Sequence, residues 1–168
     1  MNTYARGLIL AFILAGCSPA LPTGDDPTGI EGMNAAEVIE AVENLGLECS
    51  EPKKGLVNID FACVETPNVV TVLGTAVTID EVSAVSVEVA DGNERTAQRL
   101  TDALLAIPSP GSDADTGSAW LTERFANGDC VGAATRADCS IVVGSARLSL
   151  SIDRSTSHIQ VRLEGQSR

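Results

Sequence analysis

Hydrophobic and polar residues alternate in several short segments of this chain, a pattern typical of strands that cover a core with one face only. In residues 57–63, Val57, Ile59, Phe61 and Cys63 fall on one face. The same alternation recurs in 82–90, 145–152 and 158–164. Two further apolar runs, 69–73 and 76–80, flank Gly74-Thr75, a pair suited to a two-residue hairpin turn. The pattern predicts five or six strands.

Three other segments repeat apolar residues at helical spacing. The first runs from a capping box at Asn34 and Glu37 to about Leu45, with Gly46 placed as a stop. The second follows Asn93 and ends before Pro108, and the third is a short helix from Thr116 or Ser118 to about residue 127. Each helix has one apolar stripe, whereas the glutamates of the first, at 37, 40 and 43, face water.

Together these elements predict an α+β domain. We expect a mainly antiparallel sheet of five to six strands, with two or three helices packed on one face and two disulfides. The expected organisation is a signal peptide over 1–16, a tether over 17–33 and a single domain over 34–168. The tether is rich in Pro, Thr and Gly and carries Asp25-Asp26, which favours a solvated linker.

The start of the chain has the three parts of an export signal. Arg6 supplies the positive charge, residues 7–13 form an apolar run, and Ala15-Gly16 are small residues before a cleavage point. The apolar run is about half the roughly 20 residues that a membrane-spanning helix needs.

Leu14-Ala15-Gly16-Cys17 resembles the lipobox of bacterial lipoproteins. The resemblance implies that Cys17 is acylated and becomes the amino terminus, so that the domain is lipid-anchored to the cell membrane or the outer membrane and lies outside the cytoplasm. An ordinary secretory signal with Cys17 as a free thiol is the alternative.

The remaining four cysteines are an even set, which usually pairs outside the cytoplasm. Three pairings are possible, and we predict the sequential one, Cys49 with Cys63 and Cys130 with Cys139, because each pair is close in sequence with turn-forming residues between. A zinc site is the alternative, but neither pair has the short spacing of structural zinc ligands.

The balance of charge excludes a nucleic-acid partner. The chain has 11 basic and 23 acidic residues, a net charge of −12, and removal of Arg6 with the signal makes it −13. Such a surface repels nucleic acid. After the signal, Phe61, Trp120 and Phe125 are the only aromatic residues, which is too few for stacking platforms.

No motif for catalysis, a metal or a cofactor stands out, and we assign none. The chain lacks G-x-S-x-G, H-E-x-x-H, C-x-x-C and the glycine-rich phosphate loops. Asp113 and Asp115 resemble the start of a calcium loop without its later ligands. The single histidine, His158, falls on the polar face of the last strand, where a surface role is expected.

The order helix, Cys49, turn, Cys63 is echoed later by helix, Cys130, turn, Cys139. This order resembles the duplicated plan of β-lactamase inhibitory proteins in architecture only, because the chain lacks their aromatic-rich sheet face.

From these observations we expect an envelope lipoprotein with a non-enzymatic binding domain, whose partner is a protein or another envelope component. The uncovered sheet face, the loop 109–117 and Trp120 are the candidate contacts. The alternatives are a ligand- or cation-binding protein or hydrolase with a site built from dispersed acidic residues, and a purely structural spacer.

Overall fold

The structure, a computed structural model, describes residues 28–65, 69–107, 114–128, 130–133 and 135–166. These contain the helices α1 (Ala35–Glu43), α2 (Glu94–Leu105) and α3 (Ala114–Asn127). The first five strands are β1 (Glu48–Cys49), β2 (Lys53–Lys54), β3 (Ile59–Glu65), β4 (Val70–Thr78) and β5 (Glu81–Val89). The other four are β6 (Val131–Ala133), β7 (Arg136–Val143), β8 (Ala146–Asp153) and β9 (His158–Gly165).

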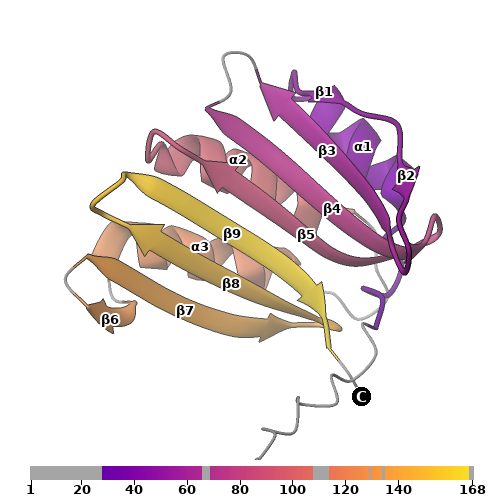
Figure 1. Cartoon of the computed structure of the whole chain (residues 1–168). Helices are drawn as coiled ribbons and strands as arrows, with labels where there is room; N and C mark the ends of the chain where they lie inside the picture. Colours follow the sequence, from indigo (N-terminus) through magenta and orange to yellow (C-terminus); the bar gives the residue numbers. More distant parts are fainter. Residues whose placement is uncertain (1–27, 66–68, 108–113, 129, 134, 167–168) are drawn as a thin grey trace, which may run out of the picture.

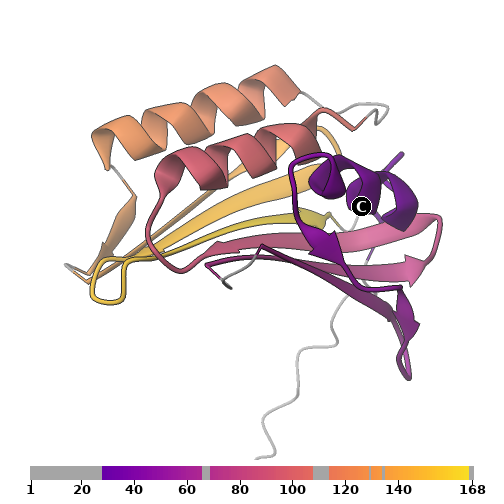
Figure 2. The ribbon, with the colours of Figure 1, turned by 90° about the horizontal axis from the view of Figure 1, so that it is seen from above.

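All the described strands join one antiparallel sheet in the order β1-β3-β4-β5-β9-β8-β7-β6, with β2 paired to β3 beside this path. The three helices lie on one face of the sheet, and no described helix covers the other face (Figures 1 and 2). The predicted α+β class is confirmed, although the sheet has nine strands rather than five or six.

The sheet order reads as two similar halves that meet at β5 and β9. Each half places its helices before four strands that are neighbours in the sheet, and each begins with a short edge strand, while the first half also contains β2. The two disulfides occupy corresponding positions. Cys49 pairs in register with Cys63 on the neighbouring strand, and Cys130 directly precedes β6 and bonds Cys139 on β7. Both predicted disulfides are confirmed, and they explain the repeated order of helix and cysteines.

The core lies between the helices and the inner face of the sheet. Val38 and Val42 of α1 are fully buried, as are Leu100 of α2 and Leu121 of α3. The inner face contributes alternate strand residues, among them Phe61, Val72, Val85, Val87, Leu148, Leu150, Ile159, Val161 and Leu163. The alternation in the sequence therefore identified the inner face correctly from Ile59 onward in β3 and in β5, β8 and β9.

Asparagine side chains begin the first two helices as predicted. Asn34 accepts a hydrogen bond from the Glu37 backbone N–H at 2.9 Å, and Asn93 accepts one from the Thr96 N–H at 3.1 Å. After α1, Gly46 has a φ of 98°, the left-handed conformation that ends a helix and suits glycine.

The predicted hairpin at Gly74-Thr75 is wrong. Val70–Thr78 is one continuous strand, and the turn falls at Ile79-Asp80 instead. Gly74 lies on the inner face, where a Cβ atom would collide with the Phe61 ring from β3. Glycine is needed here for close packing across strands and not for a turn.

Four strands, β1, β2, β6 and β7, escaped prediction, and one predicted strand begins later than expected. Residues 131–133 form β6 and residues 136–143 form β7, while β1 and β2 have only two residues each. Val57 was expected on the covered face, but β3 begins at Ile59 and Val57 lies in the β2–β3 turn with 83% of its surface exposed.

The domain begins before Asn34. Ile30 and Met33 are buried, and the Ile30 N–H and the Met33 carbonyl bond to the backbone of Val82 at 2.7 and 3.0 Å. Residues 28–33 are thus part of the packed domain rather than of the expected tether. The expected signal peptide over 1–16 and residues 17–27, including Cys17, lie outside the described residues.

Candidate functional site

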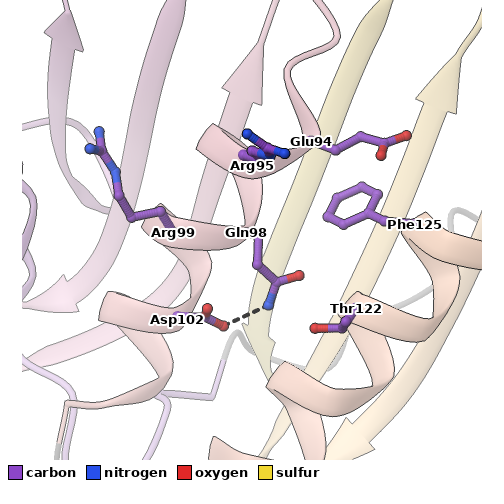
Figure 3. A pocket seen from close by; sticks show the side chains of 7 residues that line it. All are labelled: Glu94, Arg95, Gln98, Arg99, Asp102, Thr122 and Phe125. Atoms are coloured by element: carbon purple, nitrogen blue, oxygen red, sulfur yellow. Dashed lines mark hydrogen bonds between the residues drawn. The ribbon is translucent and has the colours of Figure 1, made fainter.

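A groove runs between α2 and α3 on the side of the helix pair that faces away from the sheet (Figure 3). The two helices approach closely because Gly117 of α3 is buried, and a Cβ there would touch Leu105 of α2 at 3.0 Å. The groove is open and has a volume of about 410 Å³. It is lined by Glu94, Arg95, Gln98, Arg99, Asp102, Thr122 and Phe125.

Polar groups in the groove are held mainly by one another. The Gln98 amide nitrogen donates to the Asp102 carboxylate at 2.8 Å and lies 3.4 Å from both the carbonyl and the hydroxyl oxygen of Ser118. Thr122 donates its hydroxyl to the Ser118 carbonyl at 2.9 Å. The Gln98 side-chain oxygen is buried and accepts no hydrogen bond within the described residues.

The groove combines an apolar wall with balanced charge. Phe125 extends from α3 toward α2 and supplies the wall (Figure 3). Glu94 and Asp102 are matched by Arg95 and Arg99, which makes this region neutral in a chain of net charge −12. An amphipathic, neutral groove suits a segment of another protein better than a highly charged ligand.

A second hollow, of about 340 Å³, lies on the uncovered face over β7, β8 and β9. It is lined by Arg136, Asp138, Cys139, Ser140, Ser149, Leu150, Ser151, Gln160 and Arg162. Arg136 pairs with Asp138 at 3.2 Å, and Arg162 pairs with Glu164 at 3.1 Å. Both arginine side chains of the hollow are therefore paired with carboxylates of the protein itself.

Two carboxyl groups have shifted pKa values, and both are exposed. A hydrogen bond from Ser151 lowers the pKa of Asp138, with Arg136 adding to this effect against desolvation, which raises it. The pKa of Asp153 is lowered by the Ser155 hydroxyl and by backbone N–H donors in the β8–β9 turn. Both shifts favour the ionised carboxylate, which is the opposite of what a general acid at neutral pH requires.

The structure also places the sequence-derived candidates. Trp120 is half-buried against the core with the Arg124 guanidinium 6.0 Å from its ring centre, so it helps to seat α3. His158 lies on the outer face opposite Asp153, as expected. In the loop 109–117, Asp113 lies outside the described residues, and Asp115 is in the first turn of α3.

The groove itself was not found from the sequence. Its α2 residues were visible as the polar side of a predicted helix, but which helix would pack beside that side was not. Phe125 was assigned only to the core stripe of α3. Hydrophobic periodicity predicts which face of each helix is buried, but it does not predict which two helices pack side by side.

Neither a cluster of metal ligands nor a membrane-spanning helix occurs among the described residues. No three of their His, Cys, Asp and Glu side chains are grouped closely enough to hold a metal ion. None of α1, α2 and α3 is long and apolar enough to cross a bilayer.

Comparisons with known proteins returned no match to this chain among family models, curated proteins or solved structures.

Proposed function

We propose that this protein is a lipid-anchored protein of the cell envelope whose domain binds a partner protein and does not catalyse a reaction. The anchor is proposed from Leu14-Ala15-Gly16-Cys17 and the export signal before it. The compartment draws support from the cysteines, since all four beyond Cys17 are paired in the domain, as is usual outside the cytoplasm.

The observation that carries the binding role is the α2–α3 groove. It joins the Phe125 wall and a balanced set of charges. A partner segment that places an apolar side chain against Phe125, with one acid and one base beside it, would meet complementary groups at each point.

The alternative of a hydrolase built from dispersed acids draws less support. The pKa values of Asp138 and Asp153 are lowered, and serine hydroxyls favour the ionised form of both carboxyl groups. The α2–α3 groove and the hollow over β7, β8 and β9 are open rather than deep. These features fit a surface that binds better than a cleft that excludes water.

Photo-crosslinking in intact cells tests the binding role. A photoreactive amino acid in place of Arg95 is expected to give one discrete protein adduct, and the additional change Phe125→Asp is expected to abolish it. The same amino acid at Thr156, in the β8–β9 turn, is the matched control and should give no such adduct. Equal labelling from both positions, or an adduct that survives Phe125→Asp, would refute a partner site in the groove.

A further inference from the structure

Exposed aliphatic side chains gather at one end of the sheet. Among the described residues, the large hydrophobic side chains that are exposed are Leu56, Val57, Leu73, Val77, Ile79 and Val142. All but Leu73 lie in or beside the β2–β3, β4–β5 and β7–β8 turns, at residues 55–58, 77–80 and 142–146. We call this end of the domain the turn cluster.

The strand register brings the three turns together. Ile59, which follows the β2–β3 turn, is paired with Ala76, and Ala76 is paired with Val82 just after the β4–β5 turn. Farther along the sheet, Ala84 is paired with Glu164, and Gly165 is paired with Ala146 after the β7–β8 turn. The turns therefore lie at the same ends of successive strands (Figure 1).

The β2–β3 turn is the most exposed apolar feature of this cluster. Leu56 and Val57 have relative exposures of 105% and 83%, so neither side chain packs on the domain. The turn is closed by a hydrogen bond from the Gly55 N–H to the Asn58 carbonyl at 2.7 Å. Lys53 and Lys54 precede it, both exposed, and residues 53–58 contain no acidic side chain.

The described chain begins at the same end. The Gly29 N–H donates to the Glu81 carboxylate at 3.3 Å, and the Ile30 N–H donates to the Val82 carbonyl at 2.7 Å, beside the β4–β5 turn. Thr28 follows Cys17 by eleven residues. Even when fully extended, a chain of that length reaches at most roughly 40 Å. An anchor on Cys17 thus keeps the attachment point of the turn cluster within roughly 40 Å of the bilayer, a distance that lets this end reach the lipid surface.

We infer that the tip of the β2–β3 hairpin enters the lipid interface of the membrane that holds Cys17. Leu56 and Val57 would lie at the boundary of the acyl chains, and the ammonium groups of Lys53 and Lys54 would contact lipid phosphates. This inference rests on the proposed lipid anchor. It adds a second contact that fixes the orientation of the domain and directs the far end of the α2–α3 groove, at Glu94 and Phe125, away from the membrane.

Tryptophan fluorescence tests the inference in the full chain, purified from the cells that process it. The variant Leu56→Trp is made with Trp120→Phe, and the matched control is Thr156→Trp in the same background, because Thr156 is exposed in the turn at the opposite end. Each protein is mixed with vesicles of phosphatidylcholine, or of an equal mixture of phosphatidylcholine and phosphatidylglycerol, with and without brominated acyl chains.

Emission from position 56 is expected to shift to shorter wavelength in vesicles and to lose intensity with brominated lipids, whereas emission from position 156 should do neither. Mass spectrometry of the same preparations reports whether Cys17 is acylated. An acylated protein whose position 56 stays in water would refute the hairpin contact and leave the anchor standing. Lipid contact by an unmodified protein would refute the anchor alone. A blue shift without vesicles, in a dimer, would show that a second copy covers the tip and would refute the inference.

Discussion

At the scale of single residues, the contact of Gly74 with Phe61 shows how one position can mislead a sequence-based prediction. Glycine beside threonine between two apolar runs is typical of a hairpin turn. In the folded chain it makes room for an aromatic ring on the neighbouring strand. A hairpin turn and close packing against a ring both require glycine, so the sequence at this position is the same in either case. Only the residue that lies beside Gly74 in the fold, the Phe61 ring, distinguishes the two roles.

Gly74→Ala is expected to lower the free energy of unfolding by about 1 to 3 kcal/mol, because the new methyl group overlaps the Phe61 ring. Urea unfolding monitored by circular dichroism measures the loss. In a Phe61→Leu background the same substitution should cost less, since the ring is absent. An equal cost in both backgrounds would contradict the assigned contact.

The lowered pKa values of Asp138 and Asp153 predict that each carboxyl group responds only to loss of its own serine. Ser155→Ala should raise the pKa of Asp153 toward its ordinary value and leave Asp138 unchanged, and Ser151→Ala should do the reverse. Because a lowered pKa favours the folded state only when the carboxyl is ionised, each contribution is present above pH about 4 and is lost as the pH falls through the lowered pKa. Carboxyl-carbon NMR titration measures both groups, and unmoved midpoints would contradict the assignment.

At the scale of elements, prediction succeeded where a local rule sufficed. The caps at Asn34 and Asn93, the stop at Gly46 and the β8–β9 hairpin all follow from residues adjacent in sequence. The strands β1, β2 and β6 are too short for alternation to register, since they have two or three residues each. Each of these strands is held by hydrogen bonds to a longer neighbouring strand. A disulfide also links β1 to β3, and another links the residue before β6 to β7.

The disulfides give a prediction at this scale. Replacing Cys49 and Cys63 by alanine, or Cys130 and Cys139, should each lower the free energy of unfolding by about 2.5 to 3 kcal/mol, because loops of 14 and 9 residues become free in the unfolded chain. Urea unfolding of the two double variants measures the effect. Because the bonds lie at opposite edges of the sheet, the quadruple variant should show the sum. Unchanged stability in either double variant would contradict the entropic role of that bond.

At the scale of the whole molecule, the fold class, the covered face and both cysteine pairs were predictable, whereas the candidate sites were not. The groove arises where α2 and α3 pack side by side, and the turn cluster arises where the ends of successive strands meet. Both depend on contacts between segments distant in sequence. Val57 illustrates the limit, since its alternation with Ile59 and Phe61 predicted a core position although it lies in an exposed turn.

The proposed envelope location and the inferred orientation both depend on processing at Cys17. Mass spectrometry of the amino-terminal peptide from the native protein tests this most directly. We predict that the peptide begins at Cys17 and carries acyl chains on its thiol and on its new amino group, with Met1–Gly16 absent. A peptide that retains Met1, or one in which Cys17 is unmodified, would contradict the account.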